Sequence, residues 1–304
     1  MPDTRSDQPD PSMIGGIQKA SFVFLPNPKS IFSRRARRFR TIASSHHVAA
    51  YLEFFAAISD AQSTILADLP LPELPSSDLL ARARQFAMPP LDRAGFKPTA
   101  IFRNTCRHLF KEVANISKPE IAESALARVR SLDDQSLDRM IAATLSTQPV
   151  EAAGEQIYLA AALQVYFAML ASLMDAQTLV PVAVGVCPAC GSRPSTSLVV
   201  GWHGAEGVRY ASCTLCSTLW NEVRVKCLAC GSTKGIGYQE IEDQGGTIKA
   251  ETCDECGSYI KILYQNKDAM LDPVADDVGT LGLDQMLRES AYHRAGSNPY
   301  LAGY

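Results

Sequence analysis

Eight of the nine cysteines fall into four Cys-x-x-Cys pairs that follow one template. In each half of the pattern, 22 residues separate the two pairs, and the second half repeats the first forty residues later. The first half contains Cys187, Cys190, Cys213 and Cys216, and the second contains Cys227, Cys230, Cys253 and Cys256. A pattern that recurs at a fixed offset indicates the tandem repeat of one small unit.

Thiolates in this arrangement are the ligands of a tetrahedral metal ion. Two sulfurs three positions apart can reach the same ion if the backbone turns tightly, and Gly191 and Gly231 permit such a turn after the leading pair of each half. Four sulfurs at about 2.3 Å fill the coordination of a tetrahedral ion. A filled site has no position for water or substrate, so we expect a structural or electron-carrying role rather than hydrolysis.

We therefore predict two mononuclear sites, with the first four cysteines holding one ion and the last four the other. The spacing alone also leaves an interleaved pairing open. All-sulfur tetrahedral sites suit zinc or a single iron, whereas this spacing is less typical of an iron–sulfur cluster. A thioredoxin-like role is disfavoured, because no βαβ pattern surrounds any of the pairs.

The remaining chemistry-bearing residues predict no catalytic site. Cys106 lies on an apolar helical stretch and is expected to be a buried thiol, and His203 is expected to be a solvated turn residue. His46 and His47 are adjacent on a predicted helix and should point apart. The chain has no glycine-rich phosphate loop, nucleophile elbow or HExxH motif. We expect a protein that is not an enzyme.

The charge balance argues against a nucleic-acid-binding role. The formal net charge is −3, and residues 187–256 carry six Lys or Arg against eight Asp or Glu. Two sites, each with four thiolates and one divalent ion, would make the charge more negative still. A zinc-ribbon nucleic-acid binder, which would need a basic surface, therefore stays a disfavoured alternative.

Two segments imitate export or membrane signals. SRRARRFR, residues 33–40, contains paired arginines, but the apolar run of an export signal does not follow, so an internal helix is expected. Residues 157–174 are nearly all apolar but are interrupted by Gln164, which favours a buried core helix without stable membrane insertion. Nine cysteines without a secretory signal indicate reduced thiols.

These patterns predict an α+β protein: an all-helical N-terminal domain, two tandem rubredoxin-like (zinc-ribbon-like) small β modules, and a C-terminal helix. Each module is expected to contain a β-hairpin with a thiol pair at either end, and GSYIKILY should form a further strand. The expected boundaries are a disordered lead-in at 1–20, the helical domain at 21–182, the modules at 183–224 and 225–270, and the C-terminal helix and tail at 271–304.

Several motifs together resemble the formate dehydrogenase accessory protein family, FdhE. They are FLPNPKSIFSRRARRF, CPACGSRP, RYASCTLCSTLWNEVRVKCLACG, AETCDECGSYIKILY and the ending RAGSNPYL. Trp220 and Arg224, between the two modules, also match the pattern of the family, and Val278-Gly279 is a small departure from it. The resemblance extends from about residue 22 to residue 301.

The resemblance implies a cytoplasmic factor that acts on the catalytic subunit of respiratory formate dehydrogenase during maturation. It also implies iron as the metal held by the eight cysteines, with zinc as the alternative. The partner enzyme would carry the export signal, and this chain would stay in the cytoplasm. A rubredoxin-like electron-transfer protein remains a rival interpretation, and homo-oligomerisation is left open.

Overall fold

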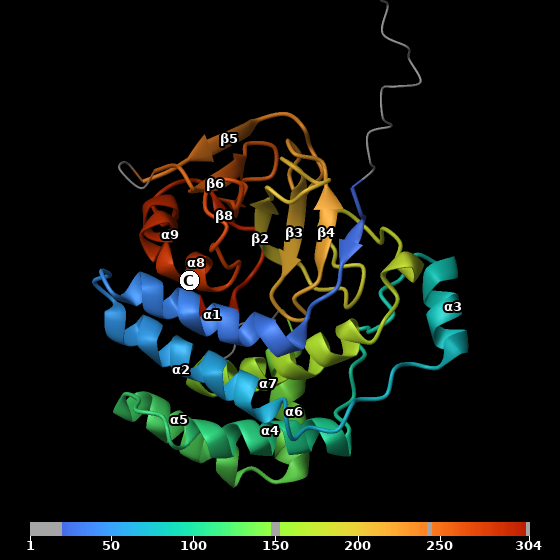
Figure 1. The fold of residues 1–304 in the computed structure, drawn as a ribbon, viewed down its shortest axis with the longest axis vertical. Helices are drawn as coiled ribbons and strands as arrows, with labels where there is room; N and C mark the ends of the chain where they lie inside the picture. The colour runs from blue at the N-terminus through green and yellow to red at the C-terminus, as the bar shows by residue number, and fades with distance from the viewer. Residues whose placement is uncertain (1–19, 147–152, 242–244, 302–304) are drawn as a thin grey trace, which may run out of the picture.

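The computed structural model describes residues 20–146, 153–241 and 245–301, which form a layer of helices beneath one mixed β-sheet (Figure 1). The predicted lead-in, residues 1–20, lies outside the described residues except for its last one. The helices of the N-terminal layer are α1 (Pro28–Ala43), α2 (Ala49–Ile65), α3 (Ser77–Gln85), α4 (Ala100–Val113), α5 (Glu120–Ser131), α6 (Asp134–Leu145), α7 (Ala153–Ser172) and the 3₁₀ turn η2 (Ala176–Thr178).

Helix α1 begins where the sequence places a helix start. The Asn27 side chain accepts a hydrogen bond from the Lys29 amide at 3.2 Å, and Pro28 occupies the first helical position. Phe32 and Phe39 are fully buried, and the Phe39 ring stacks on Phe55 of α2 with the ring centroids 5.9 Å apart. The segment SRRARRFR lies inside this helix, which confirms that it is an internal helical feature.

Helix α7 runs through the centre of the helical layer. Its side chains are buried on every face from Tyr158 to Ala171, as expected for a helix that is apolar all round. The prediction of a buried core helix is confirmed. Within the part of the chain that the structure describes, no helix combines the length and apolarity needed to cross a membrane.

The two cysteine repeats merge into one sheet. Its strands are β1 (Val23–Phe24), β2 (Pro194–Val199), β3 (Arg209–Cys213), β4 (Leu219–Glu222), β5 (Ile236–Gln239), β6 (Ile248–Cys253), β7 (Ser258–Tyr264) and β8 (His293–Arg294). The order is β1-β4-β3-β2-β7-β6-β5, with β8 beside β7. The predicted hairpins are β2–β3 and β5–β6, and both are antiparallel. Parallel pairing of β2 with β7 joins the two repeats, and the predicted fold class is confirmed.

Strand β1 lies within the region that the sequence predicts to be helical. Val23 and Phe24 pair with Trp220 and Leu219 of β4 at the edge of the sheet. Two residues are too short a segment to show strand alternation, which is why the sequence pattern misses this strand. The pairing ties the entry to α1 directly to the first module.

The C-terminal part contains two short helices, α8 (Ala275–Gly279) and α9 (Leu281–Arg288), where one was predicted, followed by the 3₁₀ turn η3 (Pro299–Leu301). Thr280 separates the helices, and its hydroxyl donates to the Asp276 carbonyl at 2.7 Å. Gly279 lies against α1, where an added Cβ would be 3.0 Å from Ile42. The break therefore allows α8 to pack closely on α1 while α9 continues along the sheet (Figure 1).

Two buried charge networks hold these parts together. Between the modules, Arg209 pairs with Glu251 at 2.8 Å and also donates to the carbonyls of Arg224 and Lys226. Under the C-terminal segment, the network consists of Lys261, Asp277, Asp284 and Arg294, with N···O distances of 2.6–3.0 Å. Arg294, the first residue of the RAGSNPYL ending, thus anchors that ending. Arg209 holds the linker between the two repeats through its hydrogen bonds to the linker carbonyls.

Candidate metal centres

The structure gathers the eight cysteines into two clusters of four. The first cluster is Cys187, Cys190, Cys213 and Cys216, and the second cluster is Cys227, Cys230, Cys253 and Cys256. Cross-pair Sγ–Sγ distances are 3.5 and 3.6 Å in the first cluster and 3.7 and 3.8 Å in the second. Four sulfurs bound at about 2.3 Å around a tetrahedral ion lie about 3.8 Å apart. The grouping is sequential, not interleaved, and its spacing fits one ion in each cluster.

The same backbone turn forms all four thiol pairs. In each, the amide that follows the second cysteine donates to the carbonyl of the first cysteine at 2.9–3.0 Å. The donor residues have positive φ angles: Gly191 (78°), Ser217 (58°), Gly231 (83°) and Gly257 (64°). Three of these positions are glycine, which adopts this conformation without a Cβ clash, and Ser217 is the exception.

Hydrogen-bond donors surround the sulfurs. The Cys216 amide lies 3.4 Å from the Cys213 sulfur, and the Ala229 and Cys230 amides lie 3.3 and 3.5 Å from the Cys227 sulfur. The Cys190 and Cys216 thiols donate to the Ser192 and Thr218 hydroxyls, and Cys256 lies 2.9 Å from the Ser258 hydroxyl. The backbone amide donors stabilise thiolate ligands, as a metal site of ionised sulfurs requires.

The thiol pKa values are shifted in both directions within each cluster. Burial raises the pKa of Cys187 well above its usual value. Burial acts in the same direction on Cys213, but hydrogen bonds with Cys187, Cys190 and Cys216 hold the pKa of Cys213 well below its usual value. In the second cluster burial also opposes ionisation, yet the Cys230 and Ala229 amides lower the pKa of Cys227 to about 7. A divalent ion would favour the ionisation of all four thiols in each cluster, with release of their protons.

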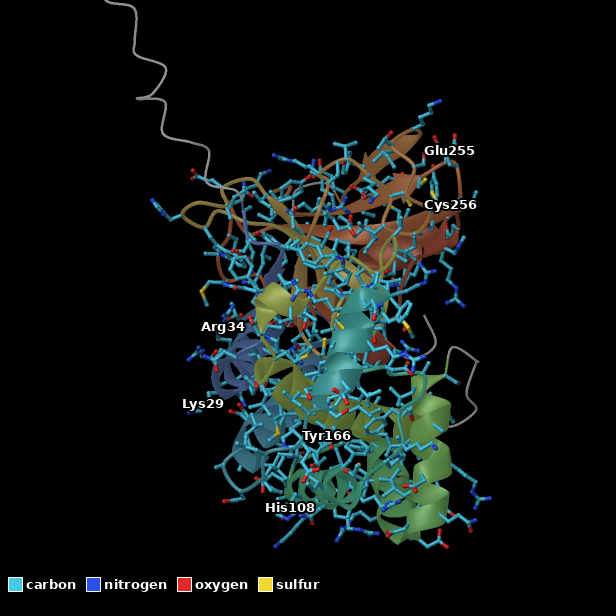
Figure 2. All side chains as sticks on the ribbon, turned by 90° about the vertical axis from the view of Figure 1, so that its right-hand side faces the viewer. Lys29, Arg34, His108, Tyr166, Glu255 and Cys256 are labelled. Atoms are coloured by element: carbon cyan, nitrogen blue, oxygen red, sulfur yellow. The ribbon has the colours of Figure 1, made fainter. Side chains whose placement is uncertain are left out.

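The two clusters differ sharply in burial. The four cysteines of the first cluster are at most 1% exposed and belong to the main apolar core. In the second cluster Cys230 is exposed and Cys256 is half-buried. Figure 2 shows Cys256 and Glu255 at the end of the molecule opposite His108, on the margin of the sheet layer. Solvent therefore contacts the second cluster directly, whereas the cysteines of the first are almost completely covered.

Gln164 of α7 connects the helical layer to the first cluster. Its Nε2 donates to the Thr214 carbonyl at 2.9 Å, inside the loop between Cys213 and Cys216. Its Oε1 accepts hydrogen bonds from Gln62 at 3.0 Å and from the Tyr300 hydroxyl at 2.9 Å. In the sequence Gln164 is visible as the polar interruption of an apolar helix, but its role depends on partners far away in the chain.

The other candidate residues form no additional site. Cys106 is fully buried, as predicted, and burial raises the pKa of its thiol far above the usual range. His203 is exposed, as expected for a solvated turn residue. The prediction for His46 and His47 was wrong: α1 ends before them, and their rings stack at 4.4 Å in the turn to α2. Across residues 20–146, 153–241 and 245–301, no other group of three potential ligands comes together.

The fold and the two clusters define a class of protein: a helical layer that carries tandem zinc-ribbon-like modules, each with its own four-sulfur site. Family models match nearly the whole chain. They are "FdhE, N-terminal" at residues 20–184, "FdhE, central domain" at residues 186–224 and "FdhE, C-terminal domain" at residues 225–301. The chain belongs to the FdhE family, which confirms the resemblance to formate dehydrogenase accessory proteins.

Individual relatives agree with this assignment. A "Protein FdhE homolog" of Rhizobium meliloti is 51% identical over 300 residues, which is 98% of each chain. A "Protein FdhE homolog" of Proteus mirabilis is 36% identical and covers 92% of this chain and 90% of its own. The crystal structure of the FdhE protein from Pseudomonas aeruginosa superimposes with a TM-score of 0.83 at 28% identity, covering 93% of this chain and 99% of that one.

Proposed function

We propose that this chain is a non-enzymatic accessory protein that assists the maturation of formate dehydrogenase in the cytoplasm, through the catalytic subunit of that enzyme. Membership of the FdhE family over nearly the whole chain is the observation that carries the proposal. Two closed four-sulfur clusters are consistent with it, because they leave no open coordination position for a substrate. The domain boundaries expected from the sequence remain predictions.

We further propose that each cluster holds one mononuclear metal ion. The family resemblance favours iron, and the donor set also suits zinc. Bound iron would supply one-electron redox chemistry, whereas zinc would serve as a cross-link. The protein contributes four thiolates and their hydrogen-bond donors, and the metal in turn stabilises modules whose own cores are small.

An electron-transfer role is the second candidate, and the solvent-accessible second cluster favours it. A carrier would hold iron and change colour reversibly on reduction. A colourless, zinc-filled protein that still supports formate dehydrogenase maturation would eliminate this candidate.

The accessory role is tested in anaerobically grown cells. The tagged chain should co-purify with the catalytic subunit of formate dehydrogenase, and a strain without the gene should lose formate dehydrogenase activity. Cys230→Ser should fail to restore that activity, whereas Cys106→Ala, a change to the cysteine outside both clusters, should restore it. Full activity in the deletion strain, together with no recovery of the subunit, would contradict the proposal.

A further inference from the structure

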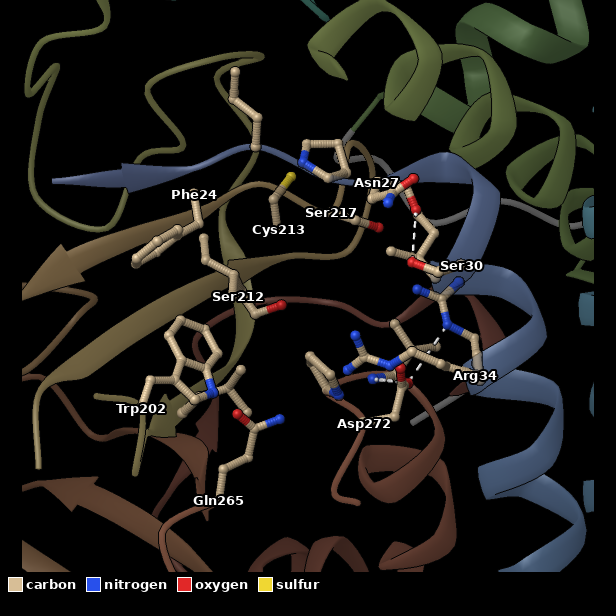
Figure 3. A pocket seen from close by; sticks show the side chains of 18 residues that line it. Phe24, Asn27, Ser30, Arg34, Trp202, Ser212, Cys213, Ser217, Gln265 and Asp272 are labelled. Atoms are coloured by element: carbon tan, nitrogen blue, oxygen red, sulfur yellow. Dashed lines mark hydrogen bonds and ion pairs between the residues drawn. The ribbon is translucent and has the colours of Figure 1, made fainter. Parts of the chain in front are cut away.

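A cavity of about 230 Å³ lies between the start of α1 and the sheet, beside the first cluster (Figure 3). Phe24, Leu198 and Trp202 give it apolar walls, and Cys213 of the first cluster also lines it. Trp202 is 36% exposed, so the cavity communicates with solvent. Neither the metal clusters nor the proposed accessory role accounts for this space.

Unpartnered polar atoms converge on the cavity. Within the described ranges, four buried side-chain polar atoms lack a hydrogen-bond partner. Three of the four belong to residues that line this cavity: Arg35 Nε, Ser217 Oγ and Gln265 Oε1. Arg35 is 2% exposed and Gln265 is 8% exposed. Buried polar groups normally find partners, so this concentration indicates a ligand that supplies them.

Ser217 is an independent sign of a ligand. The three equivalent turns have glycine at this position, and serine with a φ of 58° is strained there. The strain places a hydroxyl group at the cavity wall. Local strain of this kind persists where a functional group is needed at that point.

The charges on one side of the cavity favour an anion. The Arg34 guanidinium is exposed and has no ion pair or hydrogen bond within the described residues, and Arg35 Nε lies 3.5 Å from Asp272 without a hydrogen bond. The Asp272 carboxylate already accepts two backbone hydrogen bonds at 2.9 Å. Two arginines and one carboxylate that is already engaged therefore line the cavity, and a ligand carboxylate matches the excess of donors.

The other side of the cavity offers an acceptor and aromatic surface. Gln265 Nε2 donates to the Leu271 carbonyl at 2.7 Å, which leaves Oε1 free to accept a hydrogen bond from a ligand N–H. Figure 3 shows Gln265 and Trp202 on one side of the cavity, and Arg34 and Asp272 on the other. A ligand that spans the cavity needs an anionic oxygen group, a nearby N–H donor and an apolar body.

We propose that this cavity binds the carboxylate end of an N-acylated amino acid or of a peptide with an apolar last residue. The carboxylate would lie beside Arg34 and Arg35, the amide N–H would meet Gln265 Oε1, and the side chain would pack on Phe24 and Trp202. The site is independent of the accessory function, and its test uses binding alone.

Isothermal titration of the full-length, metal-loaded protein with N-acetylphenylalanine tests the proposal. We expect saturable one-to-one binding, and at least about tenfold weaker binding of N-acetylphenylalanine amide, which lacks the charge. The peptide Gly-Ser-Gly-Phe with a free C-terminus identifies the source. Equal or tighter binding of the peptide assigns the site to polypeptide ends, and binding of the small acid alone assigns it to free N-acyl amino acids.

Variants separate binding from folding. Ser217→Gly should leave the fold equally or more stable, because it relieves the strained φ, yet weaken binding by about three- to tenfold. Arg34→Met should weaken binding by about tenfold, whereas Arg37→Met, an exposed change on the same helix but outside the cavity, should not. The proposal is overturned if neither acid saturates the protein at about 10 mM. It is equally overturned if the amide binds as well as the acid, or if both Ser217→Gly and Arg34→Met bind like the wild type.

Discussion

The difference in burial between the two clusters predicts that they release metal at very different rates. A chelator can attack the second cluster directly, because Cys230 is exposed and Cys256 is half-buried. The sulfurs of the first cluster are at most 1% exposed, so a chelator must wait for the surrounding side chains to move, even though Cys213 borders the cavity beside α1. The free energy of a local opening can be as large as the global free energy of unfolding. If the opening that exposes the first cluster costs about 3 kcal/mol, it slows metal release about 150-fold.

Chelator-driven release from the full-length protein, loaded with the same ion at both sites, measures this difference. We expect a fast phase and a slow phase of one equivalent each, with rates at least about 100-fold apart. Cys230→Ser should remove the fast equivalent and keep the slow one. Cys106→Ala, which alters the buried thiol outside both clusters, should keep both phases.

The reasoning fails if both equivalents leave in one phase under native conditions. It also fails if Cys230→Ser abolishes the slow phase instead of the fast one. Either result would show that burial of the sulfurs does not control access to the metal.

Three further predictions concern buried polar contacts. Gln164→Leu should lower the free energy of unfolding in urea by about 2–4 kcal/mol, because it leaves the hydrogen-bonding groups that now pair with Gln164 without a partner; an unchanged midpoint would refute this. Arg209→Met should lower the free energy of unfolding by about 3–5 kcal/mol by leaving Glu251 buried and unpaired, and adding Glu251→Leu should recover most of the loss. Burial opposes ionisation of Asp277, but the charges of Arg294 and Lys261 hold the pKa of Asp277 below its usual value. On acidification the unfolded chain therefore binds this proton first, and the stability present above about pH 4 is lost as the pH falls further. Asp277→Asn should flatten this acid dependence in urea titrations, and an unchanged slope would contradict the assignment.

Much of the site could be predicted because it is built from local sequence. Each turn between paired thiols depends on a few consecutive residues, and the glycines after Cys190 and Cys230 are visible in the chain. The two hairpins and strand β7 also follow from short alternating runs. The spacing of the pairs predicts two groups of four ligands. The choice between sequential and interleaved grouping comes from the folded structure, which brings the first four cysteines together and the last four together.

The remaining features depend on contacts between distant segments. Parallel pairing of Thr196 with Lys261 joins the two repeats into one sheet, and neither strand carries a local signal for it. The different exposure of the clusters arises because α7 and its Gln164 cover the first and leave the second free. Ser217 shows the same limit, because its strain and its cavity appear only once the turn is folded.

X-ray absorption at the metal edge, combined with metal analysis of anaerobically purified protein, tests the central claim most directly. The account predicts two ions per chain, each surrounded by four sulfurs at about 2.3 Å and with no second metal nearby. One ion per chain, nitrogen or oxygen ligands in the first shell, or a short metal–metal distance would contradict it.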